Sequence, residues 1–141
     1  MVAVAALLLA TRLLPQKKGH PVAWRDLTAQ VGPLRIIRSQ HRLFRERAKL
    51  ADYLKQTRAR TSVPNVDFSK RQLLLVSPGP RSSTGYEVRV LSVQERDGKL
   101  TVKVRERTPA LQDHVAPHVT YPYRLLSLPA GEDVFVDWAG R

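Results

Sequence analysis

Residues 72–93 read QLLLVSPGPRSSTGYEVRVLSV, and this pattern sets the fold class that we expect for the whole chain. The apolar run at residues 73–76 is typical of a short strand that is buried on both faces. Residues 78–85 are rich in Pro, Gly and Ser, which bend the chain and predict a loop. Apolar and charged residues alternate from Tyr86 onward, so a second, half-buried strand is predicted to follow.

The rest of the C-terminal half also has the residue pattern of strands. Asp97-Gly98 is a two-residue turn signal of type I′ and predicts a β-hairpin around it. Pro109 ends the second strand of that hairpin, and a polar connection follows at residues 110–120. The strands expected in this half therefore lie at residues 72–76, 86–96, 99–107, 121–128 and 134–138.

The N-terminal half predicts two short strands and one helix. The strands are expected at residues 24–30 and 34–38, joined by a turn at Gly32-Pro33. Ser39 is a candidate N-cap for a helix over residues 40–57, which contain no Gly or Pro. The apolar positions of this segment form one helical stripe: Leu43, Phe44, Ala48, Leu50, Ala51 and Leu54.

Together these elements predict an α+β domain that is mainly β. We expect an antiparallel sheet or sandwich of about six to seven strands, with the amphipathic helix packed against it. A chain of 141 residues is long enough to bury one core, and it contains no cysteine, so the core has no disulfide or Cys-ligated zinc to support it. The expected organisation is an N-terminal segment at residues 1–23 and a single domain at 24–141.

The N-terminal segment begins with an apolar run at residues 2–14 that is broken by Arg12. A membrane-spanning helix needs about 20 apolar residues, so this run is too short to cross a bilayer unaided. No basic residue precedes the run, and no A-x-A cleavage site follows it. Three interpretations stay open: a signal or membrane tether whose start lies upstream, a helix packed on the domain, or a disordered tail.

Positive charge is concentrated in the N-terminal half. The net charge is +12, and residues 1–71 hold 15 of the 24 basic residues but only 4 of the 12 acidic ones. On the predicted helix, Arg42, Arg45 and Lys49 form one basic row, with Arg38 just before it. This row would suit nucleic acid or anionic lipid, or it is an ordinary solvated face. No aromatic residue is interleaved to stack on bases, so nucleic acid is the less favoured partner.

Motifs for catalysis or cofactor binding are missing from the sequence. His114 and His118 have a spacing that could chelate a metal on a helix, but Pro117 lies between them. The serines have no triad motif around them, and the loop at residues 80–86 lacks the Gly-Lys-Ser/Thr ending of a phosphate-binding loop. We therefore expect no enzyme activity, no metal and no cofactor.

The loop at residues 79–86 is the strongest candidate binding site. It consists of Gly79, Pro80, Arg81, Ser82, Ser83, Thr84, Gly85 and Tyr86. Loops that project from a rigid sheet commonly form contact surfaces, and Arg81 to Thr84 are suited to that role. In the alternative interpretation, Gly85 only supplies a positive φ between two strands and Tyr86 only joins the core.

Several motifs occur in a fixed order along the chain: VPNVDFSK at 63–70, GPRSSTGY at 79–86, the Asp97-Gly98 hairpin, Thr108-Pro109, and VTYPY at 119–123. This order resembles the PrcB C-terminal-like family, although Ser82 and Ser83 stand where that family usually has Pro and Gly. The resemblance implies a non-catalytic, mostly β protein of the bacterial cell envelope. The family's namesake is a subunit that assembles with a secreted protease complex and stabilises it.

A second, shorter similarity concerns the SSTGY part of the same loop, at residues 82–86. It is similar to one loop of the chagasin-like inhibitors of cysteine proteases. The expected function is therefore a protein-interaction module in the cell envelope or outside the cell. The alternatives are nucleic-acid binding through the basic helix, with a cytoplasmic location, and protease inhibition of the chagasin type.

Overall fold

The computed structural model describes residues 19–140, and the expectations for residues 1–18 lie outside this range. Within the described range the chain forms eight strands and two helices. In chain order these are β1 (His20–Pro21), β2 (Arg25–Asp26), α1 (Thr28–Val31), β3 (Gln40–Phe44), α2 (Arg47–Gln56), β4 (Arg71–Ser77), β5 (Glu87–Arg96), β6 (Lys99–Arg107), β7 (Arg124–Pro129) and β8 (Asp133–Trp138).

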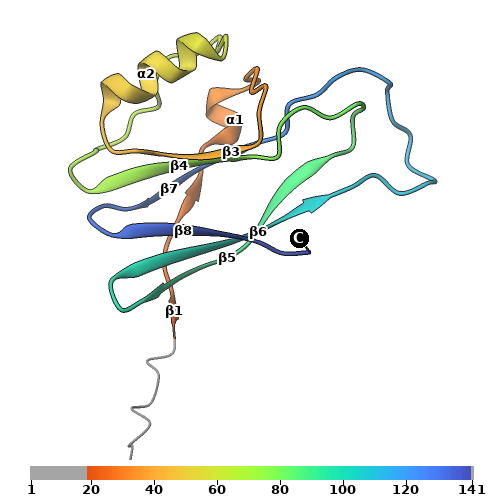
Figure 1. Ribbon diagram of the computed structural model, residues 1–141. Coiled ribbons are helices and arrows are strands. Elements are labelled where there is room, and N and C mark those ends of the chain that lie inside the picture. Colours follow the sequence, from red (N-terminus) through yellow and green to blue (C-terminus); the bar gives the residue numbers. More distant parts are fainter. Residues whose placement is uncertain (1–18, 141) are drawn as a thin grey trace, which may run out of the picture.

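The strands form two four-stranded sheets, and the helices add a third layer (Figure 1). One sheet has the order β2-β7-β4-β3 and lies in the middle of the molecule. The helices α1 and α2 cover one face of this middle sheet. Its other face packs on the sheet of order β1-β5-β6-β8. This arrangement confirms the mainly β, α+β class predicted from the sequence.

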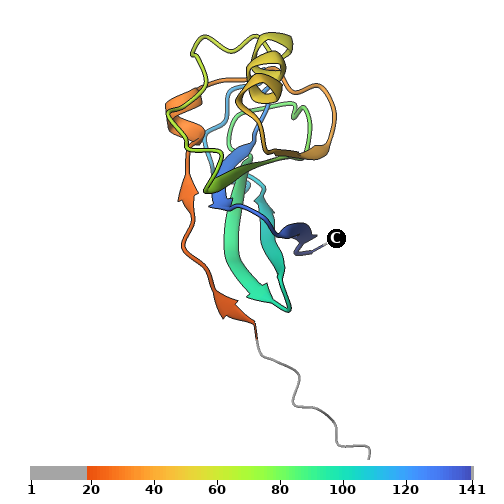
Figure 2. The same ribbon diagram turned by 90° about the vertical axis from the view of Figure 1, so that its left-hand side faces the viewer.

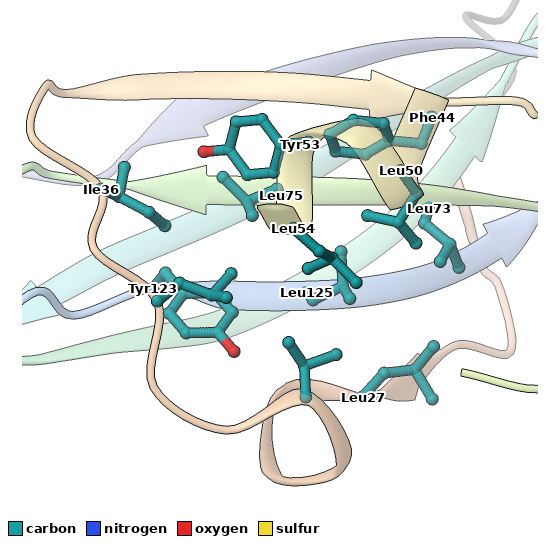
Figure 3. Close-up of a cluster of buried hydrophobic side chains, with 12 residues drawn as sticks. Leu27, Ile36, Phe44, Leu50, Tyr53, Leu54, Leu73, Leu75, Tyr123 and Leu125 are labelled. Atoms are coloured by element: carbon teal, nitrogen blue, oxygen red, sulfur yellow. The ribbon is translucent and has the colours of Figure 1, made fainter. Parts of the chain in front are cut away.

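The position of β4 in the middle layer explains the apolar run at residues 73–76. Leu73 and Leu75 join the core beneath the helices, which Figure 3 shows, whereas Leu74 and Val76 face the other sheet. All four side chains are at most 1% exposed. Burying one such side chain contributes about 1.5–3 kcal/mol, so a strand in the middle layer gains from apolar residues on both faces.

The outer sheet is built on the predicted hairpin of β5 and β6. Asp97 and Gly98 have φ of 52° and 73°, and positive φ at both positions is what a type I′ turn requires. The register shifts between Val90 and Ser92, which marks a β-bulge at the exposed Leu91. Strand β8 then pairs with β6 in parallel, so this sheet is mixed and not purely antiparallel.

The first described residues connect the two sheets. Strand β1 pairs with β5 in the outer sheet, and a few residues later β2 pairs with β7 in the middle sheet. Figure 2 shows this segment rising along one edge of the molecule. His20 and Pro21 belong to the N-terminal segment expected at residues 1–23, and both pair with β5 in the outer sheet.

The helix predicted over residues 40–57 is wrong in its first part. Residues 40–44 form β3, which pairs antiparallel with β4, and only Arg47–Gln56 is helical. Leu43 and Phe44 pack in different cores, as neighbouring side chains of a strand must. The N-cap is Glu46, in an extended conformation, and not Ser39. Pairing with the buried β4 has overridden a local pattern that also fits a helix.

The prediction for residues 24–38 is wrong as well. Only Arg25–Asp26 is a strand, Thr28–Val31 is a short helix, and residues 34–38 have no regular structure. Leu34 and Ile36 are nevertheless buried against the middle sheet. These residues are apolar because the loop that carries them is buried over the core. A buried loop and a short buried strand have the same apolar pattern, so the sequence cannot distinguish them.

Candidate functional site

The candidate binding loop at residues 79–86 leaves β4 through a fixed turn. The hydroxyl of Ser77 accepts a hydrogen bond from the Gly79 amide at 3.0 Å and donates one to the Pro122 carbonyl at 2.9 Å. Gly79 has φ of 88°, and a Cβ there would lie 2.9 Å from the backbone nitrogen of Ser39. Only glycine fits this close backbone approach without strain.

Backbone and side-chain hydrogen bonds join this loop to the connection between β6 and β7. Arg81 and Thr120 exchange two backbone hydrogen bonds of 2.9 Å, as a β-bridge. The Thr84 hydroxyl accepts from the Ala116 amide at 2.8 Å, and the Thr84 amide donates to the Ala116 carbonyl at 3.1 Å. The Thr120 hydroxyl donates to the Ser83 carbonyl at 2.7 Å. The two loops therefore form one unit, which lies at one end of the sheets (Figure 1).

Arg81 adds a charged contact to the outer sheet. Its Nε and Nη2 donate to the two carboxylate oxygens of Glu106 on β6, at 2.7 and 2.8 Å. This hydrogen bonding raises the pKa of Arg81 above its ordinary value. The guanidinium also lies 5.8 Å from the centre of the Tyr86 ring. A two-pronged pair of this kind is stronger and more directional than a single surface contact.

The exposed part of this loop unit mixes apolar side chains with polar ones, and the exposed polar residues include Ser82, Gln112, His114 and His118. In the first loop Pro80, Ser82 and Gly85 are exposed, while Arg81, Ser83 and Thr84 are half-buried. In the second loop the exposed aliphatic side chains are Leu111, Val115 and Val119. We call these six exposed residues the loop-pair surface: Pro80, Ser82, Gly85, Leu111, Val115 and Val119.

The role expected for Arg81 to Thr84 therefore differs from the role that the contacts give them. Of these four residues only Ser82 is exposed. The Arg81 side chain holds the first loop to Glu106 on β6, and Ser83 and Thr84 hydrogen bond to the second loop. Gly85 does have a positive φ of 96°, and a Cβ there would lie 2.9 Å from Pro109 and 3.1 Å from Val115. Gly85 thus permits the two loops to touch.

The sequence prediction missed Leu111, Val115 and Val119, because it treated residues 110–120 as a polar connection. A signal existed, since six of the eleven residues at 110–120 are Ala, Leu, Val or Pro, in a stretch that has no strand or helix pattern. Large exposed apolar side chains that gather in one place on a folded protein commonly mark an interaction site. Leu111 is fully exposed, and Val119 is 57% exposed.

The basic residues predicted to form a row on one helix come from three different elements. Arg42 lies on β3, Arg45 in the turn before α2, and Lys49 on α2 itself. These three line one open hollow of about 700 Å³ together with two acids, Glu46 and Asp52, but Arg38 is not part of its lining. The charge of this hollow is therefore mixed and not uniformly basic.

Residues 19–140 contain no cluster of potential metal ligands. No three His, Cys, Asp or Glu side chains come together there to hold a metal. His114 and His118 are both exposed in the loop between β6 and β7, and no described histidine side chain hydrogen bonds to a serine. Neither α1 nor α2, the described helices, has the length and apolarity to cross a membrane.

The fold and this site define a class of protein: a three-layer, mainly β domain with two joined loops at one end, one of which exposes three aliphatic side chains. Residues 73–129 match the family model described as PrcB C-terminal. The match confirms the resemblance to this family, and it extends from the core of β4 to the end of β7, so it includes both loops. No match was found among curated proteins, nor among solved structures.

Proposed function

We propose that this protein is a non-catalytic interaction module that binds a partner protein through the loop-pair surface. The observation that carries the proposal is the composition of this surface: Leu111, Val115 and Val119 are exposed on a loop that hydrogen bonds and an ion pair fix to the sheets. A loop whose backbone is already held in place loses little backbone freedom on binding, which favours a specific interface.

The PrcB C-terminal match supports a partner of a particular kind. The family resemblance implies a subunit that assembles with a secreted protease complex, so we propose a protease or another complex of the bacterial cell envelope as the partner. The cell envelope, or the space outside the cell, is the corresponding location. A membrane tether through residues 2–14 would be consistent with this location.

The test is a pull-down from native cells with the full chain as bait. The loop variant is Leu111→Ser/Val119→Ser, and the matched control is Phe135→Ser. Phe135 is also an exposed hydrophobic residue, at 51%, but it lies on β8, away from the two loops. The wild type and the control should retain the same partner, and the loop variant should lose it. If the loop variant retained the partner, or if the control lost it as well, the assignment of this surface would be refuted.

Two further assays separate this proposal from its alternatives. Purified protein that hydrolyses peptides or esters would contradict the non-catalytic assignment, and inhibition of papain-like proteases would favour the chagasin-type function. Nucleic-acid binding would weaken steeply with salt, since it releases counterions from the phosphates. Recovery of nucleic acid from the cytosolic fraction, unaffected by the loop variant, would favour that alternative instead.

A further inference from the structure

A second hollow shares Arg42, Tyr53 and Gln56 with the first, and its own lining contains three arginines and no acid. It has a volume of about 450 Å³, within the range of small-molecule sites. Its walls come from the loop before β3, from β3, and from the C-terminal end of α2. We call it the arginine hollow, and its polar lining residues include Arg35, Gln40, Arg42, Tyr53, Gln56 and Arg58.

Tyr53 is one of the lining residues of this hollow, and its hydroxyl has no hydrogen-bond partner among residues 19–140. Its side chain is only 4% exposed, and its oxygen is buried without a hydrogen-bond partner in the described part of the chain. Figure 3 shows the hydroxyl directed toward Ile36, another residue of the lining. Buried hydroxyl groups almost always find a partner, because leaving one unpaired costs free energy. A group that accepts this hydrogen bond would complete the site.

The three arginines of the hollow are not neutralised by acids of the chain. None of the ion pairs among residues 19–140 involves Arg35, Arg42 or Arg58. Arg42 is instead positioned by the ring of Tyr53, 5.0 Å from its centre. The C-terminal end of α2 contributes about half a negative charge nearby, which three full positive charges outweigh. The net field in the hollow therefore favours an anion.

The geometry points to a binding site for a phosphate monoester group in the arginine hollow. Each guanidinium offers up to five donors, and the Tyr53 hydroxyl and two glutamine amides add more. A carboxylate has two oxygens and one charge, whereas a phosphate monoester has three terminal oxygens and up to two charges. The phosphate monoester therefore makes better use of these donors. The site is separate from the loop-pair surface and does not depend on its function.

The first test measures the binding of inorganic phosphate to the full chain by calorimetry and by the phosphate-induced rise in melting temperature. Tyr53→Phe removes only the unpartnered hydroxyl, so the free protein should be at least as stable as the wild type. Phosphate binding should weaken about tenfold or more, the usual effect of losing a hydrogen bond to a charged group. The melting temperature of this variant should respond correspondingly less to phosphate.

A second variant and a control make the test independent of Tyr53. Arg58 has φ of 59°, a conformation that suits glycine, so Arg58→Gly removes one charge while relieving the backbone. It should also weaken phosphate binding about tenfold. The control is Arg105→Ala on β6, an exposed arginine of the outer sheet, which should leave binding unchanged. An equal loss in all three variants would mean unspecific attraction and would overturn the site.

The source of the phosphate is distinguished with vesicles. Preferential binding to phosphatidic acid over phosphatidylglycerol vesicles, lost in Tyr53→Phe, would support the site with a lipid headgroup as its source. Binding of inorganic phosphate without such a preference would support a soluble source. No response to phosphate or to phosphatidic acid would overturn the inference. Binding only to an oligonucleotide, unchanged in Tyr53→Phe, would overturn it in favour of a general nucleic-acid surface.

Discussion

The ion pair between Arg81 and Glu106 should be a main constraint on the candidate site. Its two hydrogen bonds measure 2.7 and 2.8 Å, and the side chains are only 25% and 12% exposed. Hydrogen bonds to charged groups contribute about 1.5–3 kcal/mol each when buried, and exposure to solvent lowers this value. We therefore expect a coupling free energy of about 1.5–2.5 kcal/mol for the pair as a whole.

A double-mutant cycle measures this coupling. Arg81→Met, Glu106→Gln and the double variant would be unfolded in urea, and the free energies of unfolding compared with the wild type. The cycle is required because Glu106 has a further interaction besides that with Arg81. The matched control is the cycle of Arg96→Gln and Asp97→Asn. That pair is 3.9 Å apart with side chains 48% and 61% exposed, so its coupling should be below about 0.5 kcal/mol.

Amide hydrogen exchange provides a local readout of the same prediction. The Thr120 amide donates to the Arg81 carbonyl, and the Ala116 amide donates to the Thr84 hydroxyl. Both amides should exchange faster in Arg81→Met, because the first loop loses its attachment to β6. A coupling below about 0.5 kcal/mol together with unchanged exchange would refute this reasoning. Arg81 would then be available for the contact role that the sequence alone indicates.

Three further predictions concern the core, the turns and pH. Leu74→Ala and Leu75→Ala should each cost about 2–5 kcal/mol in urea unfolding, since the two side chains are buried in different cores; tolerance of either change would contradict the three-layer arrangement. Gly79→Ala should destabilise more than Gly98→Ala, because both have positive φ but only a Cβ at the former meets backbone; equal losses of stability would exclude this steric cause. Burial, and secondarily the charge of Asp26, raises the pKa of Tyr123 to about 12, so the folded protein keeps this proton longer than the unfolded chain. The free energy of unfolding should fall by about 2 kcal/mol between pH 10 and 12, and Tyr123→Phe should remove this part of the pH dependence. The same slope in both proteins would contradict this assignment.

The sequence by itself determined the elements whose signals are local. The apolar run of β4, the Asp97-Gly98 hairpin and the strand at β8 all form where the pattern predicts them. In each case the residue types fix the conformation directly: apolar residues at successive positions require two buried faces, and Asp-Gly tolerates positive φ at both turn positions. The mainly β class and the family resemblance follow from these same segments.

Only the tertiary structure decided the elements whose stability comes from distant partners. Residues 40–44 become a strand because β4 offers them an open edge, although their apolar spacing also fits a helix. The two loops show the same dependence: Arg81 and Thr84 are polar residues suited to contacts, but Glu106 and Ala116 engage them and leave the apolar side chains exposed. A sequence pattern records which groups are polar, whereas the fold decides which of these groups have already found partners within the chain.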